Sequence, residues 1–194
     1  MLLLRNIAQV VTLRGGPIPR TGASMSDLGI IDNGALLVRG DRIVWVGVTK
    51  DIPVREPGIR YQTLDGVGLE LVAMPGFVDA HTHPIFAGNR VEEYDLRSRG
   101  KSYEEIAASG GGIAASVAQL RSASIRQLLE RAERNCRHFL SHGTTTIEAK
   151  SGYGLSVEDE LKSLQVLAEL RERSRLEIVP TFLGAHAVPK EHVN

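Results

Sequence analysis

The sequence predicts an α/β protein, in which a small β-structure precedes the first β/α units of a parallel sheet. Short apolar strands with glycine turns dominate roughly the first 70 residues. From Pro75 onward, strands alternate with amphipathic helices, the pattern typical of βαβ units. Only three such strands precede Asn194, whereas a closed (β/α)₈ barrel takes about 250 residues. The chain is therefore either part of a longer barrel or an open three-stranded module.

The β-structure of the first part is clearest in a hairpin. Ala35–Arg39 and Arg42–Gly47 are apolar strand candidates on either side of Gly40 and Asp41. These two residues predict a two-residue turn, because glycine adopts positive φ at little cost. Asp65 and Gly66 predict a second hairpin turn of the same kind. The two prolines within 51–58 predict a loop between them.

The second part begins with a short strand at Gly76–Ala80, followed by a long loop. Ser102–Glu105 has the pattern of a capping box and predicts the start of a helix. Gly110–Gly112 lacks the residues of a phosphate-binding loop, so we expect a flexible loop over the site.

Two further strands, each preceded by a helix, complete the pattern. The first helix spans about Ser124 to Leu140, and Thr144–Ala149 follows as a buried strand. Ser156 caps the next helix, which precedes a strand at Glu177–Leu183. The predicted buried stripe of the first helix is Ile125, Leu128, Leu129, Ala132, Cys136 and Leu140; that of the second is Leu161, Leu164, Ala168 and Leu170.

Composition excludes several classes of function. Lys and Arg number 23 and Asp and Glu number 23, so no basic surface favours nucleic acid or anionic lipid. The apolar run Met1–Leu4 is far too short to span a membrane, and it lacks the features of a signal peptide. The single cysteine, Cys136, cannot form an intrachain disulfide, which favours the cytoplasm. Its place on the apolar stripe predicts a core residue rather than a nucleophile.

His81 and His83 carry the sharpest chemical signal. They lie two residues apart at the end of the first strand of the parallel sheet, so both side chains project from one face. Neighbouring neutral imidazoles are ligands that a divalent metal prefers. The alternative is a pair of histidines that only hydrogen-bond near the end of a sheet.

Pro75–His83 resembles the metal-binding signature of the amidohydrolase superfamily, in which both histidines bind the catalytic metal. Within that superfamily, strings along essentially the whole chain are similar to the imidazolonepropionase family. They are Phe86–Arg90, Gly100–Ile106, Gly110–Ile113, Glu148–Leu155 and Thr181–Pro189. The resemblance implies a small β-sandwich segment over residues 1–74 and the first units of a metal-dependent hydrolase barrel, incomplete here, over residues 75–194.

The resemblance also implies roles for six residues. His81 and His83 bind one divalent metal ion, zinc or iron. Arg90, Tyr103 and Tyr153 hold the propionate carboxylate of a small-molecule substrate, to which an arginine offers two parallel donors. His186 contacts the ring carbonyl under attack. Taken singly, Arg90 could be a solvated loop charge, Tyr103 could pack on its helix, Tyr153 could belong to a turn, and His186 could be a satisfied loop histidine.

Other residues are expected to be structural. His138 and His142 lie near a helix end, where the helix dipole favours them, and His192 is expected to be exposed. Lys150 is not expected to be a carboxylated bridging lysine, because related two-metal hydrolases supply that residue from a later strand. The resemblance therefore implies a site with one metal.

The implied reaction is hydrolysis of 4-imidazolone-5-propanoate to N-formimidoyl-L-glutamate in histidine degradation, by a parent enzyme that is often a homodimer. In this family the remaining metal ligands and the acid–base residues come from later strands, so we expect the 194-residue chain alone to be inactive. Two alternatives stay open: another amidohydrolase or deaminase acting on a nitrogen heterocycle, and a non-catalytic β/α module. The carboxylate-binding set argues against the deaminase, and metal uptake would argue against the module.

Overall fold

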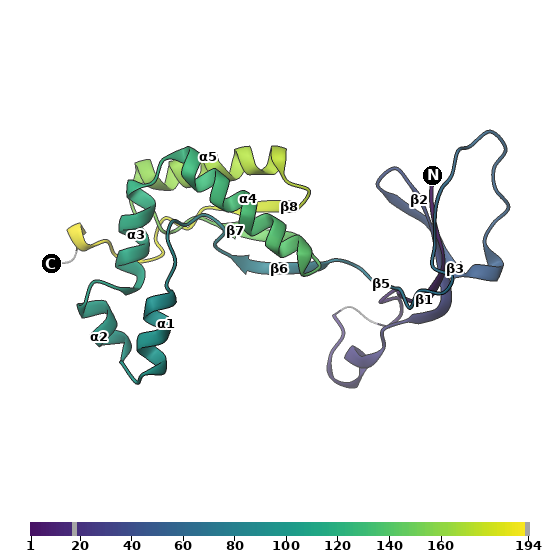
Figure 1. The fold of residues 1–194 in the computed structure, drawn as a ribbon, viewed down its shortest axis with the longest axis horizontal. Helices are drawn as coiled ribbons and strands as arrows, with labels where there is room; N and C mark the ends of the chain where they lie inside the picture. Colours follow the sequence, from purple (N-terminus) through teal and green to yellow (C-terminus); the bar gives the residue numbers. More distant parts are fainter. Residues whose placement is uncertain (17–18, 193–194) are drawn as a thin grey trace. The chain divides into compact units, whose positions relative to one another are not determined.

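The computed structural model describes residues 1–16 and 19–192 and divides the chain into two units, Met1–Pro75 and Gly76–Asn194 (Figure 1). Each unit has a sheet of its own. The barrel is expected to be cut at Asn194, and this residue lies outside the described residues. No helix in the described part of the chain is both long and apolar enough to cross a membrane.

The first unit is built on a five-stranded sheet. Its strands are β1 (Leu2–Val11), β2 (Ile30–Arg39), β3 (Arg42–Val48), β4 (Gln62–Asp65) and β5 (Val72–Ala73). The order is β3-β2-β1-β4, and β5 also pairs with β1. Short 3-10 turns, η1 (Gly22–Ser26) and η2 (Thr49–Asp51), lie in the connections. The described residues of this unit thus contain one sheet.

The predicted β2–β3 hairpin is confirmed. Arg39 pairs with Arg42 across the turn, and Gly40 has a φ of +61°. This positive φ lets two antiparallel strands join through two residues, which a residue with a β-carbon does less readily.

The second predicted hairpin, at Asp65 and Gly66, is wrong. β4 and β5 do not pair with each other; both run parallel to β1 along the same edge. The turn between them closes through a hydrogen bond from the Leu69 amide to the Gly66 carbonyl. It lies where the register of β1 shifts at Asn6, which has a φ of 54°. Turn residues alone do not show whether the two flanking strands pair with each other as a hairpin or each pair with a third strand.

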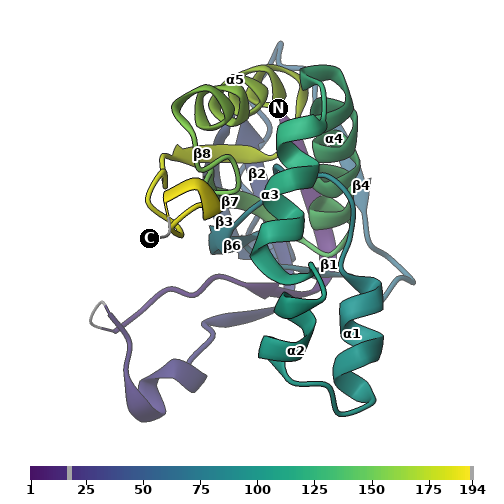
Figure 2. The ribbon, with the colours of Figure 1, turned by 90° about the vertical axis from the view of Figure 1, so that its left-hand side faces the viewer.

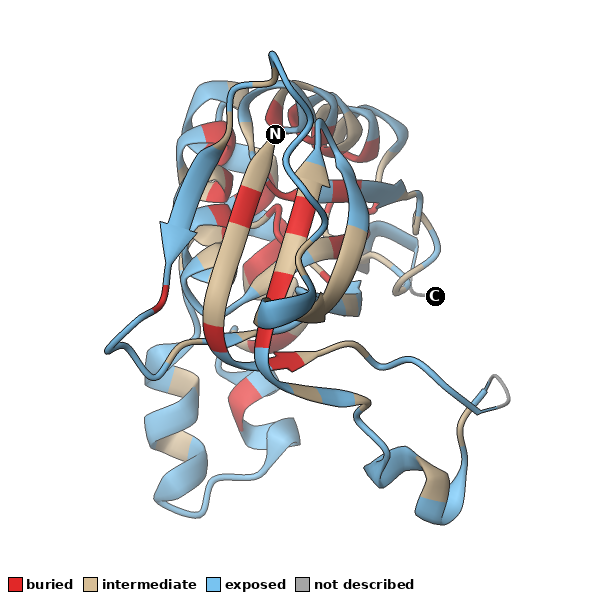
Figure 3. Cartoon of the chain, turned by 90° about the vertical axis from the view of Figure 1, so that its right-hand side faces the viewer, coloured by how far each residue is buried: buried red, intermediate tan, exposed pale blue. Residues whose placement is uncertain are grey.

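The buried apolar residues of the first unit lie in β1 and β2. Leu3, Ile7, Ala35 and Leu37 are buried. Figure 3 shows buried stretches along the strands of this sheet among stretches of intermediate exposure. The connection after β3 is tied to β1 there, because the Asn6 amide donates to the Thr49 hydroxyl at 2.9 Å. Apolar side chains of β1 and β2, such as Leu4 and Val38, line an open groove of about 500 Å³.

The second unit contains the predicted parallel sheet. Its strands are β6 (Phe77–Thr82), β7 (Thr144–Lys150) and β8 (Glu177–Thr181), in the order β6-β7-β8, all parallel. The last strand is shorter than expected, because it ends before Phe182. A short η3 turn (Lys190–His192) follows.

Helices α4 (Ile125–Ser141) and α5 (Val157–Arg173) connect these strands and cover one face of the sheet (Figure 2). Both begin as predicted, because the hydroxyls of Ser124 and Ser156 accept backbone N–H groups of the first turn. The core between helices and sheet includes Leu128, Leu129, Ala132, Cys136, Ile147, Ala149, Val166, Leu167, Leu170 and Ile178. The core position of Cys136 is therefore confirmed.

The predicted buried stripe of α5 is confirmed at Leu170 and at the partly buried Leu164, and it is wrong at Leu161 and Ala168. Leu161 is 59% exposed and Ala168 is exposed, whereas Val166 and Leu167 are fully buried. The buried face runs through Glu160, Ser163, Val166, Leu167 and Leu170. Two polar residues belong to this face, and a prediction based on apolar residues alone does not include them.

The segment between β6 and α4 is more helical than expected. It contains α1 (Val91–Ser98) within the predicted long loop, α2 (Tyr103–Ala108) at the predicted capping box, and α3 (Gly112–Ser122), which was not predicted. The capping box of α2 is confirmed, since Ser102 and Glu105 bond reciprocally at 3.2 and 2.9 Å. The expected glycine loop is only a tight turn, because Gly112 is already the first residue of α3.

Candidate active site

Three aromatic side chains meet where the parallel strands end. His83 directly follows β6, Tyr153 lies in the loop after β7, and His186 lies in the loop after β8. The ring centroids of His83 and His186 are 4.8 Å apart, with the planes inclined by only 15°. Tyr153 lies 4.9 Å from His83 and 5.4 Å from His186. Because parallel strands end at one edge of a sheet, residues far apart in sequence share this place.

The alternation of β6 places the two predicted metal ligands on the same side. Thr82 between them is buried, and its hydroxyl donates to the Glu148 carbonyl of β7 at 2.7 Å. His81 and His83 therefore project away from that contact, and their ring centroids are 5.6 Å apart. His81 is exposed and His83 is half-buried.

His83 is in the form that a metal ligand requires. Burial, together with the neighbouring His186 and His81, lowers the pKa of His83 below its usual value. The imidazole is thus neutral near neutral pH and keeps a lone pair for coordination. Its Nδ1 atom is buried and has no hydrogen-bond partner among the described residues. An unsatisfied buried nitrogen beside a second imidazole fits a metal site.

The described residues contain no cluster of three or more His, Cys, Asp or Glu that could hold a metal. Catalytic zinc sites usually have three protein ligands and one open position. His81 and His83 therefore supply part of such a site and not all of it.

His186 is oriented by the loop that carries Tyr153. Its Nδ1 lies 2.9 Å from the Gly152 carbonyl oxygen. A carbonyl can only accept, so Nδ1 carries a proton, and in the neutral ring Nε2 has a free lone pair. In this tautomer Nε2 accepts a proton, and it can donate a hydrogen bond only after the ring has become an imidazolium.

Arg90, the N-cap residue of α1, is paired with an acidic side chain. Its Nε donates to Glu93 Oε2 at 2.8 Å, and the other oxygen of Glu93 accepts the Gly112 amide at 2.8 Å. The bond from Glu93 is the main reason why the pKa of Arg90 lies above its usual value, and Tyr153 and Tyr103 add to it. Arg90 thus lies within electrostatic reach of both predicted tyrosines.

Tyr103 is one of three exposed residues among the six predicted ones, with His81 and Arg90. It is the first residue of α2 and is exposed. A β-carbon added at Gly112 would lie 3.5 Å from its hydroxyl oxygen, so Tyr103 lies over the start of α3. The structure therefore gathers His81, His83, Tyr153 and His186, and it places Arg90 and Tyr103 together beside the bridge formed by Glu93.

Sequence reasoning missed the acidic residues that support this arrangement. Glu93 holds Arg90, and Glu160 bonds to the loop that carries Tyr153. Glu148 pairs with Lys150, with both side chains mostly buried. Burial opposes ionisation of Glu148, but Lys150, Thr181 and His81 outweigh it and keep its pKa below the usual value. An acidic residue near a glycine-containing loop was the available signal, and it is common in any sequence.

The remaining histidines lie elsewhere. The rings of His138 and His142 are 4.3 Å apart at the end of α4, and His142 Nδ1 lies 2.9 Å from the His138 carbonyl oxygen. Such a bond occupies a free carbonyl of the last helical turn, as expected from the dipole. His192 is exposed, as predicted.

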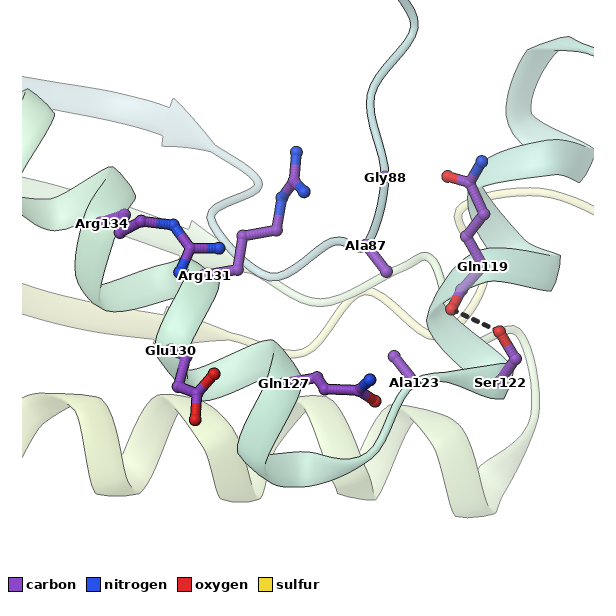
Figure 4. A pocket seen from close by; sticks show the side chains of 9 residues that line it. All are labelled: Ala87, Gly88, Gln119, Ser122, Ala123, Gln127, Glu130, Arg131 and Arg134. Carbon is purple, nitrogen blue, oxygen red and sulfur yellow. Dashed lines mark hydrogen bonds between the residues drawn. The ribbon is translucent and has the colours of Figure 1, made fainter.

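A cavity of about 430 Å³ lies apart from the ring cluster (Figure 4). Its lining includes Gln119, Gln127, Arg131 and Arg134 but none of the six predicted site residues. Arg131 stacks over Phe86 at 4.8 Å. The carboxylate of Glu130 in the same lining offsets the positive charge of the arginines, so the cavity is not a clear anion site.

Comparison with known proteins points to one family. The chain is 50% identical over 189 residues to an imidazolonepropionase from Solibacter usitatus, a match that covers 97% of this chain and 44% of the relative. It is 45% identical over 192 residues to an imidazolonepropionase from Symbiobacterium thermophilum, covering 98% of this chain and 44% of that protein. The chain is a relative of the imidazolonepropionases. It spans less than half the length of the imidazolonepropionases that it matches. No protein-family model matches it.

Solved structures agree on the fold. An atrazine chlorohydrolase from Arthrobacter aurescens TC1, solved in complex with zinc, matches with a TM-score of 0.56 at 16% identity over 94% of this chain and 35% of that one. A triazine hydrolase variant matches with a TM-score of 0.58 at 17% identity, covering 92% and 35%. The predicted fold class, a small β-structure followed by parallel β/α units, is thus confirmed for this imidazolonepropionase relative.

Proposed function

We propose that the chain is the N-terminal portion of an imidazolonepropionase that hydrolyses 4-imidazolone-5-propanoate to N-formimidoyl-L-glutamate. The observation that carries this proposal is the gathering of His81, His83, Tyr153 and His186 at the ends of three parallel strands. It occurs in a sequence up to 50% identical to proteins of that name. The proposal assigns each of these residues a task in the reaction.

In this proposal Arg90, Tyr103 and Tyr153 bind the carboxylate of the substrate. Arg90 uses Nε for Glu93, and a guanidinium has further N–H donors for a second carboxylate. Tyr103 and Tyr153 can donate their hydroxyls to the same group. Since Glu93 already fixes the guanidinium, little side-chain entropy is lost when the substrate binds.

Proton transfer and charge stabilisation at the ring carbonyl are the task of His186. Its Nδ1 proton is held by the Gly152 carbonyl, so the exchangeable site is Nε2. A proton taken up at Nε2 lets His186 donate to the oxygen on which negative charge develops. Because Nδ1 is bonded to the Gly152 carbonyl, Nε2 is the nitrogen that can act on the substrate.

His81 and His83 would hold one divalent cation, zinc or iron. When bound there, the ion supplies Lewis acidity and a hydrolytic nucleophile at neutral pH. The remaining ligands and the groups that move protons to and from the leaving nitrogen lie, in this proposal, in the part of the relatives that the chain does not cover.

The test pairs metal content with turnover. We expect zinc or iron to bind the wild-type chain and to be lost in His81→Ala and His83→Ala, whereas His142→Ala keeps it. The absorbance of 4-imidazolone-5-propanoate should decay with the full-length enzyme and not with this chain alone. Turnover by a full-length His83→Ala variant at the wild-type rate would falsify the assignment, and equal metal loss in His142→Ala would place the metal elsewhere.

A further inference from the structure

Glu160 is a buried acidic residue whose oxygens are both fully engaged. It lies in the first turn of α5 and is only 2% exposed. Oε2 accepts the Gly152 amide at 2.9 Å, and Oε1 accepts the amides of Gly154 and Leu155, both at 2.8 Å. Burying a carboxylate is costly unless it is well hydrogen-bonded, and bonds to an ionised acceptor are stronger than neutral ones. The first turn of a helix also favours negative charge.

The loop bound by Glu160, residues 152–155, has a backbone conformation that its residues do not favour by themselves. Leu155 has a φ of 52°, in the left-handed region that non-glycine residues avoid. Gly152 has a φ of 114°. A β-carbon at Gly154 would lie 2.6 Å from backbone atoms of Asp159 and Glu160, so the loop lies directly against the start of α5. Such a conformation persists only when its surroundings impose it.

The same loop connects Glu160 to the ring cluster. The amide of Gly152 is bound by Glu160, and its carbonyl accepts from His186 Nδ1 at 2.9 Å. Tyr153 lies between two residues whose amides are both bound by Glu160. Ser151 adds a second tie, because its hydroxyl accepts the Leu183 amide at 3.0 Å. Neither Tyr153 nor His186 touches Glu160 by an interaction of its own ring among those described.

We infer that Glu160 is the positioning residue that sets Tyr153 and His186 against His83. The inference rests on the proposed function for the roles of those rings, and on the hydrogen bonds alone for their placement. A merely structural role predicts that loss of Glu160 lowers the stability of α5 and leaves the rings in place. A positioning role predicts that the loop and the rings change while the helix remains.

The decisive variant is Glu160→Gln, which keeps the length of the side chain but presents an NH₂ group to at least one backbone N–H. Glu158→Gln is the matched control, because Glu158 is an exposed acid in the same helical turn. Amide hydrogen exchange and ring-to-ring nuclear Overhauser effects would be measured on the 194-residue chain. We expect the amides of Gly152, Gly154 and Leu155 to exchange at least about tenfold faster in Glu160→Gln, with weaker contacts from Tyr153 and His186 to His83.

Unchanged loop exchange and unchanged ring contacts in a folded Glu160→Gln variant would overturn the inference. If that variant does not fold, the wild-type chain still decides. The amide protons of Gly152, Gly154 and Leu155 must be shifted downfield and protected, and random-coil shifts with fast exchange would refute the inference without any variant.

Turnover separates this inference from the proposed function. In the full-length enzyme, Glu160→Gln should lower kcat/KM about ten- to a hundredfold, as expected for a misplaced contact, and Glu158→Gln should change it less than about twofold. If the wild-type enzyme does not hydrolyse 4-imidazolone-5-propanoate, the proposed function fails, while hydrogen exchange and ring contacts still test the positioning role. Normal turnover by Glu160→Gln in an active enzyme would show that positioning by Glu160 is not needed.

Discussion

Leu167 and Leu161 lie on the same helix, six positions apart, in opposite environments. Leu167 is fully buried against the sheet, whereas Leu161 is 59% exposed. Leu167→Ala should lower the free energy of unfolding by about 2 to 5 kcal/mol, because it leaves a cavity in a packed core. Leu161→Ala should change it by no more than about 0.5 kcal/mol. Urea denaturation followed by far-ultraviolet circular dichroism measures both, and a larger effect of Leu161→Ala would mean that the helix is rotated.

At this scale the sequence predicted which side chains gather at the strand ends better than which residues support them. The alternation of a strand was enough to put His81 and His83 on one side. Arg90 and Glu93 are three residues apart at the start of α1, so their pairing is local. The bond from the Gly112 amide to Glu93 depends on how α1 meets α3, and the bonds of Glu160 depend on backbone amides that a sequence pattern does not show. Backbone donors are present at every residue except proline, so their use is decided by tertiary structure.

The bulge in β1 is fixed by a polar cluster around Asp65. Its carboxylate accepts from Asn6 Nδ2 at 2.7 Å and from Arg5 Nε at 2.8 Å. These bonds, that of Asn6 first, hold the pKa of Asp65 below its usual value. The stabilisation is therefore complete above the unfolded pKa, about 3.9, and is lost as the pH falls through the lower folded value.

We expect the urea midpoint of the first unit to fall as the pH is lowered from about 5 to 2, and to fall less in Asp65→Asn. Trp45, the single tryptophan of the chain, lies in β3 and reports on this unit by fluorescence. Asp41→Asn, at an exposed turn aspartate, serves as the control and should keep the wild-type slope. An Asp65→Asn variant with the full wild-type slope would contradict this account of the bulge.

Elements with a strong, regular pattern were predicted well, and those stabilised by polar contacts were not. Helix α4 has the predicted apolar stripe, and Leu128, Leu129, Ala132 and Cys136 of that stripe are buried. Helix α1 is mostly polar and has no buried residue, so periodicity could not reveal it. Helix α3 starts at a glycine, which disfavours a helix, but Glu93 accepts the first amide there. The turn at Gly66 was misread because β4 and β5 share one partner strand.

On the scale of the whole molecule, the face of the three-stranded sheet opposite α4 and α5 is open. Val78 and Val179 lie on this face and are 70% and 49% exposed. Exposed apolar surface next to unpaired strand edges favours association between chains. We expect sedimentation velocity to show concentration-dependent self-association, reduced by Val179→Lys.

Val54→Lys is the matched control, because Val54 is 95% exposed but lies in a loop of the first unit. It should leave the association unchanged. A wild-type chain that stays monomeric at all concentrations, or an equal effect of both substitutions, would show that the open face does not drive the association.

The pairing of β1 also sets the order in which the first unit can form. Leu2 pairs with Gln62, and Gln9 pairs with Val72, on one edge of the strand. During synthesis β1 leaves the ribosome before β4 and β5. One of its two hydrogen-bonding edges therefore has no partner until residues 62–73 have emerged. Closing so long a loop costs chain entropy before the new strand contacts can stabilise it, and this slows folding. Folds dominated by such long-range pairing fold in about milliseconds to seconds. Until then β1 can pair only with β2, and its other edge is an open, apolar strand edge, at which a nascent chain is prone to aggregate.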